Sequence, residues 1–127
     1  MTDVASVEEK VAALKAKMWK KQFFVMHRRI VDPARIKPVM FEHYQWIIGL
    51  EKQGKVLLSG PVAQRDGRPG VGMTIFRAGS WEEAQDLAAG DPFVTAGAAD
   101  FTLGEWQINE GRLTIQVDLS DMSSHVD

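Results

Sequence analysis

The sequence predicts one α+β domain whose six core elements follow the order β-α-β-β-α-β, the ferredoxin-like arrangement. Two segments, residues 39–53 and 80–89, repeat apolar residues every three or four positions, which is typical of helices that bury one face. Short apolar runs with the length of strands stand before, between and after these segments. In this arrangement both helices cover one face of a four-stranded antiparallel sheet. The other face needs a cover, and we expect sheet-on-sheet dimerisation to supply it.

An additional helix is expected ahead of this core, within residues 1–21. Ser6 is followed three residues later by Glu9, which is a capping-box pattern. Apolar side chains then recur with helical spacing at Val7, Val11, Leu14 and Met18. Because this apolar stripe is narrow, we expect the helix to lie on the outside of the domain or on a partner subunit.

The first strand is predicted over residues 22–31. Its first half holds apolar side chains on both faces, as a strand in the middle of a sheet does. Arg28 and Arg29 follow and mark the exit of the strand toward water. The Asp-Pro pair at residues 32–33 then ends it.

The helix of residues 39–53 carries a histidine, His43, on its apolar face. The apolar members of that face stand three or four residues apart: Val39, Trp46 and Leu50. Gly54 is the expected C-terminal cap of this helix. A short buried strand at residues 56–58 follows, and the Ser-Gly-Pro turn at residues 59–61 ends it.

The second half of the core repeats this pattern. Residues 71–76 form an apolar run that we expect to pair antiparallel with residues 56–58 across a polar loop. Ser80 caps the second helix, and Asp91 caps a short helical turn that Pro92 opens. The remaining segments are the rest of that turn to residue 98, a strand at 101–108, a turn at 109–111, a half-buried strand at 113–118 and a polar tail at 119–127.

Composition fits one soluble domain, which we place at residues 22–118. Of the 127 residues, 45% are hydrophobic and 25% are charged, close to the average of globular proteins and enough for one core. A net charge of -2 argues against nucleic-acid binding, which needs a concentrated basic surface. The sequence has no cysteine, which excludes disulfides, thiolate metal ligands and cysteine nucleophiles.

Targeting signals are not recognised in the sequence. No apolar run approaches the roughly 20 residues of a membrane helix. The first ten residues include acidic side chains and lack the apolar stretch of a signal peptide. We therefore expect a cytoplasmic protein without a membrane partner.

Two interpretations of His43 stand side by side. In one, His43 is a core residue whose ring nitrogens are satisfied by the backbone or a neighbouring side chain. In the other it is a general base, because imidazole titrates near neutrality and can accept a substrate proton. Such a base needs a partner that fixes its tautomer, and Asp91 is the best candidate because the two helices should lie side by side. Asp91 is also the predicted N-cap, so both roles require that one of its oxygens is left free.

Substrate binding is assigned to Arg28, Trp46, Ser59 and Phe93. Arg28 would hold a carboxylate or phenolate, and the two aromatic rings would line an apolar pocket, although such arginines are often solvated and such rings often core. Ser59 is not expected to be a nucleophile because it lies in a strand-end turn and not in a nucleophile elbow. The histidines form no His-x-x-x-His pair, and the Gly-rich turn at residues 66–72 lacks the strand-glycines-helix order of a dinucleotide site. We therefore expect neither a metal nor a cofactor.

Several motifs together resemble the YciI-like (YCII-related) domain family. They are E-H-Y-x-W at residues 42–46, LLSGP at 57–61, SWEEAQDLAAGDPF at 80–93 and T-A-G at 95–97. The resemblance covers roughly residues 22–108. It implies a dimeric α+β barrel of two ferredoxin-like units and a pocket with a histidine and an aspartate, which map onto His43 and Asp91. The helix before this region and the strand after it depart from the short family pattern.

The resemblance also implies a kind of chemistry. The family is similar in fold to muconolactone isomerases, and some members resemble dehydrochlorinases that eliminate HCl from chlorinated hydroxyquinols in aromatic degradation. The leading hypothesis is a cofactor-free lyase or isomerase, active as a homodimer or higher homo-oligomer, in which His43 is the base and Asp91 orients it. A small anionic ring would sit against Trp46 and near Arg28. The alternatives are a non-catalytic ligand-binding or interaction module and an oxidase of the same barrel type, with or without haem.

Overall fold

The computed structural model describes residues 4–68 and 70–126, which belong to two compact units. The terminal unit combines the N-terminal residues up to Lys21 with the chain from Ile108 onward. The central unit comprises Gln22–Gln107 and contains every predicted site residue.

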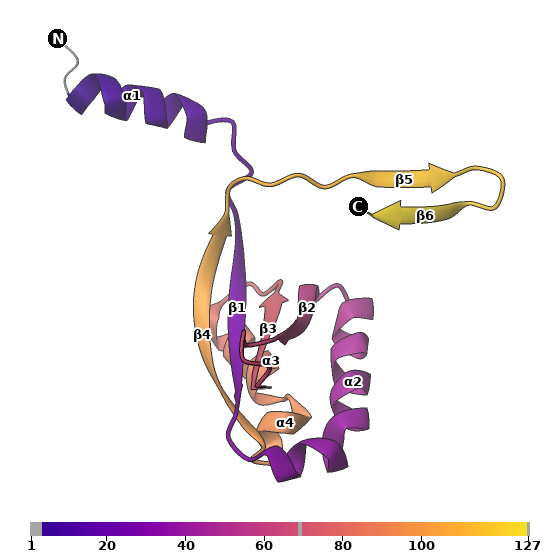
Figure 1. Cartoon of the computed structure of the whole chain (residues 1–127). Helices are drawn as coiled ribbons and strands as arrows, with labels where there is room; N and C mark the ends of the chain where they lie inside the picture. Colours follow the sequence, from indigo (N-terminus) through magenta and orange to yellow (C-terminus); the bar gives the residue numbers. More distant parts are fainter. Residues whose placement is uncertain (1–3, 69, 127) are drawn as a thin grey trace. The chain divides into compact units, whose positions relative to one another are not determined.

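The central unit has the predicted order of elements, and its strands form one sheet in the order β2-β3-β1-β4 (Figure 1). Its elements are β1 (Lys21–Ile30), the 3-10 turn η1 (Pro33–Arg35), α2 (Ile36–Lys52), β2 (Val56–Val62), β3 (Val71–Phe76), α3 (Trp81–Ala89), α4 (Pro92–Thr95) and β4 (Ala99–Ile108). This strand order is that of the ferredoxin-like arrangement, so the predicted fold class is confirmed. The sheet is open and does not close on itself.

Antiparallel pairing fixes which side chains share a face of the sheet. In the pair of β1 and β3, Met26 lies opposite Thr74, and Arg28 lies opposite Gly72. In the pair of β2 and β3, Ser59 lies opposite Thr74. Because directly opposed residues point to the same side of a pleated sheet, these five positions share one face.

β4 completes the sheet along the other edge of β1. Just past the end of β1, Val31 N–H donates to the carbonyl of Ala98 at 2.8 Å. Two residues earlier, Arg29 pairs with Asp100 at 2.6 Å. From the first contact to the second, the residue number falls in β1 and rises in β4, so the two strands are antiparallel.

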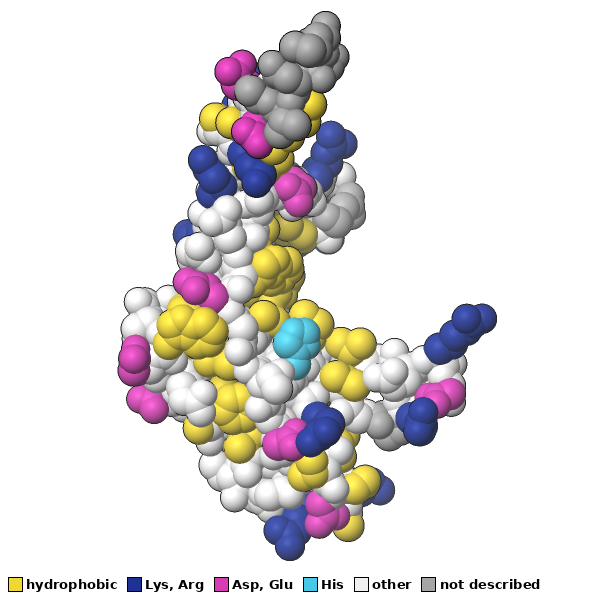
Figure 2. Space-filling model, turned by 90° about the vertical axis from the view of Figure 1, so that its left-hand side faces the viewer, with side chains coloured by type: hydrophobic (Ala, Val, Ile, Leu, Met, Phe, Trp, Pro, Cys, Tyr) yellow, Lys and Arg dark blue, Asp and Glu magenta, His cyan; other side chains and the backbone are white. Residues whose placement is uncertain are grey.

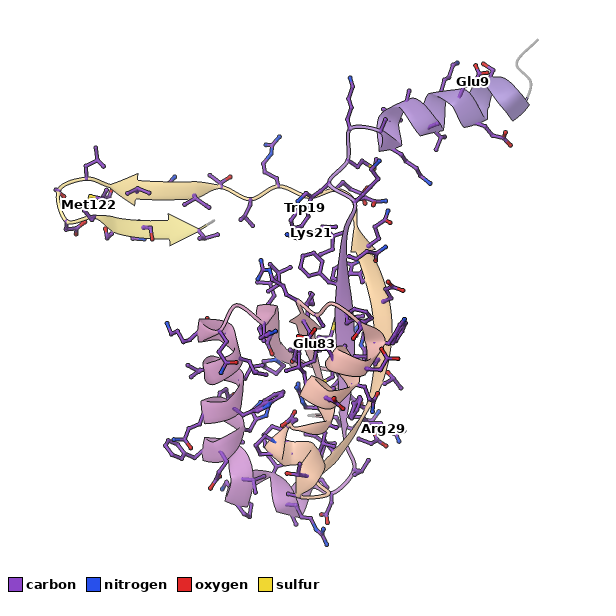
Figure 3. The ribbon with its side chains drawn as sticks, turned by 180° about the vertical axis from the view of Figure 1, so that it is seen from behind. Glu9, Trp19, Lys21, Arg29, Glu83 and Met122 are labelled. Atoms are coloured by element: carbon purple, nitrogen blue, oxygen red, sulfur yellow. The ribbon has the colours of Figure 1, made fainter. Side chains whose placement is uncertain are left out.

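The face that carries Met26 and Arg28 is covered by α2 and α3, with the main core between the helices and the sheet (Figure 3). The buried members of this core are Phe24, Met26, Ile47, Leu50, Val56, Phe76, Ala84 and Ala88. Lys55 and Glu83, whose charged groups lie 2.7 Å apart, join the end of α2 to the first turn of α3. The two helices therefore lie side by side on the sheet, as the sequence predicted.

Hydrophobic side chains also lie across the opposite face of the sheet, with a histidine among them (Figure 2). Leu58 is 64% exposed and Trp106 is 42% exposed on this face, where Ile75 is buried. Single exposed apolar residues are ordinary, but a sheet face that carries several of them is typical of an interface. The dimer that would cover this face stays a prediction.

Two element boundaries differ from the sequence prediction because of proline. α2 begins at Ile36 and not at residue 39, since Pro38 lies in the first turn, where backbone N–H groups lack intrahelical partners. β2 continues through Pro61 to Val62, although a turn was predicted at residues 59–61. β2 is an edge strand, and a proline is tolerated there because its missing N–H is not needed for pairing.

The terminal unit holds α1 (Val4–Lys15), β5 (Ile115–Asp118) and β6 (Ser123–Val126). α1 begins before Ser6, so the predicted capping box does not mark its start. β5 and β6 form a two-stranded hairpin, and the residues of β5 are exposed where a half-buried strand was predicted. β6 falls in the segment predicted to be a polar tail. In the described chain, none of the helices is long and apolar enough to cross a membrane.

Gly54 ends α2 as the sequence predicted. Its φ of 76° lies in the left-handed region. Its own N–H bonds to the carbonyl of Glu51 at 3.0 Å, and the N–H of Lys55 bonds to that of Leu50 at 2.9 Å. This pair of bonds is a Schellman motif, and it turns the chain from α2 into β2.

Replacing Gly54 and Gly49 with alanine is expected to change stability in opposite directions. Gly54→Ala should lower the free energy of unfolding by about 1–2 kcal/mol, because a side chain is strained at this φ. Gly49→Ala should raise it by up to about 1 kcal/mol, since a Cβ at this position in α2 meets no atom within 4 Å. Urea denaturation of both variants measures the difference. Equal effects of the two substitutions would contradict the Schellman assignment.

Candidate active site

The candidate site is a cleft of about 660 Å³ between α2 and the strands β1, β2 and β3. Apolar side chains of α2, including Met40, Tyr44 and Ile47, form one wall. The cleft brings together four of the predicted site residues, which are Arg28, His43, Ser59 and Phe93. Its size is within the range of small-molecule sites.

His43 and Asp91 are in contact beneath this cleft. His43 Nδ1 lies 2.7 Å from Asp91 Oδ1. α2 supplies the histidine, and the N-cap position of α4 supplies the aspartate. Asp91 is fully buried, and His43 is 7% exposed. Because an ionised carboxylate can only accept hydrogen bonds, Nδ1 carries the proton and Nε2 is the basic nitrogen.

Asp91 performs the predicted capping role and contacts His43 at the same time. Its Oδ1 also accepts the N–H of Phe93 at 2.9 Å, which is the N-cap bond of α4. Its Oδ2 accepts Nε of Arg28 at 2.5 Å. One oxygen thus serves the cap and the histidine together, and the other is left for the arginine.

The charge of Asp91 is set by a competition between burial and its partners. Burial opposes ionisation, but the hydrogen bond from His43, the positive charge of Arg28 and the N–H of Phe93 together outweigh it. The pKa of Asp91 consequently lies below its ordinary value. The carboxylate is therefore ionised at neutral pH and is a constant acceptor for His43 Nδ1.

A stacked aromatic ring also restricts the orientation of the His43 imidazole. Phe93 stacks on it with ring centroids 3.9 Å apart and an angle of 13° between the planes. Nε2 of His43 has no protein partner among the described residues. Those residues also contain no buried side-chain nitrogen or oxygen without a partner, so Nε2 must be open to the cleft. A basic nitrogen is thus held in a fixed plane and faces the space where a ligand would bind.

Arg28 is buried, which corrects the prediction that it marks the exit of the first strand toward water. It is 6% exposed, whereas its neighbour Arg29 forms a surface pair with Asp100. The signal was present in the strand alternation, because Arg28 follows Phe24 and Met26 on the same parity. Burial became possible because Asp91, distant in sequence, provides a carboxylate on that face.

Thr74 is a site residue that the sequence analysis missed. It is fully buried on β3, and its Oγ1 accepts Nη2 of Arg28 at 3.1 Å. The same oxygen lies 2.8 Å from Oγ of Ser59, which lines the cleft from β2. A threonine in an apolar strand carries no sequence signal for this role, since only the register of β2 and β3 brings the two hydroxyls together.

Trp46 does not line the cleft but lies next to the histidine. Its ring centroid is 5.8 Å from that of His43 and 6.4 Å from that of Phe76 in the core. Two further arginines lie at the surface and not in the cleft: Arg65 is exposed, and Arg68 pairs with Asp66 at 2.6 Å. In the described ranges, no group of three or more histidine, aspartate or glutamate side chains has an arrangement that could hold a metal ion.

Gly72 leaves room for the Arg28 guanidinium. A Cβ at this position would lie 3.0 Å from Arg28 Nη1, and the guanidinium cannot easily move because Asp91 and Thr74 hold it. We expect Gly72→Ala to lower the free energy of unfolding by about 1–3 kcal/mol and to weaken ligand binding in the cleft. Gly104→Ala is the control, because its Cβ would meet Val25 at an ordinary 3.5 Å. Calorimetry measures both the stability and the ligand affinity. A Gly72→Ala variant with the stability and affinity of Gly104→Ala would contradict the prediction.

The central unit is thus a small α+β domain with an open ferredoxin-like sheet and a buried histidine–aspartate pair under a cleft. The chain belongs to the YCII-related domain family, whose model matches residues 2–107. The resemblance seen in the sequence is therefore confirmed over most of the chain.

Two known proteins are similar to parts of this chain. YjpA, an uncharacterized protein of Bacillus subtilis strain 168, is 28% identical over 68 residues, which cover 54% of this chain and 75% of YjpA. A solved structure of 5-chloro-2-hydroxyhydroquinone dehydrochlorinase (TftG) from Burkholderia phenoliruptrix AC1100, in complex with 2,5-dihydroxybenzoquinone, aligns with a TM-score of 0.51 and 22% identity. That alignment covers 66% of this chain and 92% of the other. At this identity the likeness supports the fold.

Proposed function

We propose that the protein is a cofactor-free lyase or isomerase in which His43 removes a proton from a small anionic ring compound. The observation that carries the proposal is the 2.7 Å contact of His43 Nδ1 with the buried Asp91, which leaves Nε2 open to the cleft. A base held by a carboxylate in this manner contributes about 10²–10⁴ in rate.

Each group around the base has a part in the proposed reaction. Nε2 of His43 accepts a proton from a ring hydroxyl or an acidic C–H, and the resulting imidazolium is stabilised by the ionised Asp91. The negative charge that develops on the substrate is met by the guanidinium of Arg28 at the bottom of the cleft. The apolar wall of α2 suits a ring.

The outcome of the reaction depends on the substrate. In a chlorinated hydroxyquinol, one hydroxyl proton first moves to the carbon that bears chlorine, which gives a keto tautomer. Loss of a second hydroxyl proton to His43 then sends an electron pair through the ring, and the C–Cl bond breaks with chloride keeping its pair. The products are then a quinone and HCl. In an unsaturated lactone with no leaving group, the protonated His43 returns the proton to another carbon, and the product is an isomer. The dehydrochlorinase name and bound quinone of the structural neighbour favour the first type of substrate.

A ligand-binding module without catalysis is the second candidate. The hydrogen bonds of Asp91 favour this candidate, because the fully buried carboxylate uses both its oxygens on protein groups. Such a satisfied network rigidifies a structure whether or not a reaction takes place. In this case a ring compound would bind in the cleft and leave unchanged.

A turnover assay distinguishes the two candidates. Chlorinated hydroxyquinols are incubated with the protein under anaerobic conditions, which prevents their spontaneous oxidation, and chloride release is measured with product identification by mass spectrometry. An unsaturated lactone is tested in parallel for rearrangement. Turnover above the buffer rate supports the enzyme. Calorimetric binding of 2,5-dihydroxybenzoquinone with no turnover of any ring compound would support the binding module instead.

A further inference from the structure

We infer that Thr74 orients the Ser59 hydroxyl and the Arg28 guanidinium so that both donate to a second, anionic oxygen of the substrate. The inference rests on the proposed function, since it assigns the subsite that holds the ring while His43 takes its proton. It makes Thr74 a positioning residue, and it makes the Ser59 hydroxyl and Arg28 Nη1 the groups that touch the ligand.

The direction of the hydrogen bond between Thr74 and Ser59 follows from the donors and acceptors that surround the two hydroxyls. Arg28 can only donate, so Thr74 Oγ1 is the acceptor of the 3.1 Å bond from Nη2. Thr74 is fully buried, and its own hydroxyl proton needs an acceptor. Ser59 Oγ, at 2.8 Å, is the acceptor available among the described residues. Thr74 therefore donates to Ser59.

The proton of Ser59 is consequently free for a ligand. Its oxygen is occupied by the donor from Thr74, and the residue lies on the exposed part of β2, where it lines the cleft. The opposite direction, with Ser59 donating to Thr74, would leave the buried threonine proton unpaired. That arrangement costs more free energy than a serine proton facing water in the open cleft.

Arg28 supplies a second donor to the same region. Its Nε is used by Asp91, and its Nη2 by Thr74 and the sulfur of Met26. Nη1 has no protein partner in the part of the chain that the structure describes, and it is not buried without one, so it faces the cleft beside Gly72. A fixed cation and a fixed hydroxyl thus converge from β1 and β2, as a subsite for an anionic oxygen requires.

The subsite narrows the class of substrate. A compound that uses both His43 and the pair of donors places an anionic oxygen at the donors and an acidic hydroxyl or C–H at Nε2 of His43. A ring with two or more hydroxyl or carbonyl oxygens meets this requirement. A ring with a single oxygen meets it only if the proton that it loses comes from an acidic C–H.

Three substitutions test the inference, with 2,5-dihydroxybenzoquinone as the calorimetric probe and a chlorinated hydroxyquinol as the substrate. Ser59→Ala and Thr74→Val are expected to weaken binding of the probe and to raise KM by about tenfold to a hundredfold, while kcat changes little. Thr74→Ser keeps the hydroxyl and should retain wild-type affinity. Thr114→Val, at an exposed position of the terminal unit, is the matched control.

The outcomes separate this inference from the proposed function. Wild-type affinity and KM in both Ser59→Ala and Thr74→Val would overturn the inference and leave the general-base proposal intact. A wild-type protein that neither binds the probe nor turns over any ring compound would overturn the proposed function and the inference with it. If Thr74→Val does not fold, which its thermal unfolding curve shows, Ser59→Ala and Thr74→Ser decide the question: the first must lose affinity and the second must keep it.

Discussion

Replacing His43 with asparagine is expected to reduce kcat/KM by about a hundredfold to ten-thousandfold without unfolding the protein. The amide nitrogen of asparagine can occupy the place of Nδ1 and donate to Asp91, so the buried carboxylate keeps its partner. The basic nitrogen that faces the cleft is lost. Because the proton acceptor acts only in the chemical step, kcat should fall and the affinity for a non-reacting ring compound should change little.

Two controls sharpen this experiment. His125→Asn removes an exposed histidine from β6, in the terminal unit, and should leave kcat/KM unchanged. His43→Ala leaves space for free imidazole, which should restore part of the turnover if a basic nitrogen is what was lost. A His43→Asn variant with wild-type kcat would refute the role of His43 as a base.

Replacing Asp91 with asparagine is expected to have the largest combined effect on activity and stability. The neutral amide cannot balance the charge of buried Arg28, and it presents a donor to either the arginine or His43. Removing one partner of a buried ion pair costs about 3–5 kcal/mol of unfolding free energy. The histidine also loses the acceptor that holds its proton on Nδ1, so kcat should fall by about a hundredfold or more. Nitrogen NMR of the ring detects the change of tautomer.

The loss of stability in Asp91→Asn should depend on pH in a defined direction. Because the pKa of Asp91 is lowered in the folded protein, its ionisation stabilises the fold fully above the ordinary carboxyl pKa, about 4. That contribution disappears as the pH falls through the folded value. Urea denaturation at a series of pH values should therefore show a wild-type advantage that is constant near neutrality and shrinks below about pH 4.

Asp100→Asn is the control for the same measurement. Asp100 also pairs with an arginine, Arg29, but on the surface, where water and salt screen the interaction. Its substitution should change the unfolding free energy far less than that of Asp91. Equal losses from the two substitutions would mean that burial of the Arg28–Asp91 pair has no energetic consequence, which would contradict the account of the site given above.

The fold was predictable because its signals are local. Helical spacing over residues 39–53, the Ser80 cap and Gly54 each act within one or two turns, and all three were found where the sequence indicated. Apart from the starts of α1 and α2, the errors lie where a distant partner decided the outcome. Pro61 remains in β2 because that strand is at an edge, and β6 exists because β5 folds back on it.

The residues of the candidate site were likewise predictable only where their signal is local. His43 and Asp91 were identified from the sequence, because one is a polar residue on an apolar helix face and the other caps a helical turn. The burial of Arg28 and the parts of Thr74 and Gly72 were not predicted, since each depends on which residue lies opposite in the sheet. Trp46, an aromatic residue on the same helix face as His43, was assigned to the substrate, yet it is not part of the cleft lining.

The sequence by itself determined the order of the elements, the fold class and the two residues that carry the proposed chemistry. It could do so because helix periodicity, caps and turns depend on residues that are neighbours in the chain. Only the tertiary structure decided the contact of His43 with Asp91, the burial of the arginine and the link from Thr74 to Ser59. These depend on strand register and on distances between segments up to 63 residues apart in the chain, as with Arg28 and Asp91. No local pattern encodes the two contacts, and strand alternation indicates only the face on which Arg28 lies.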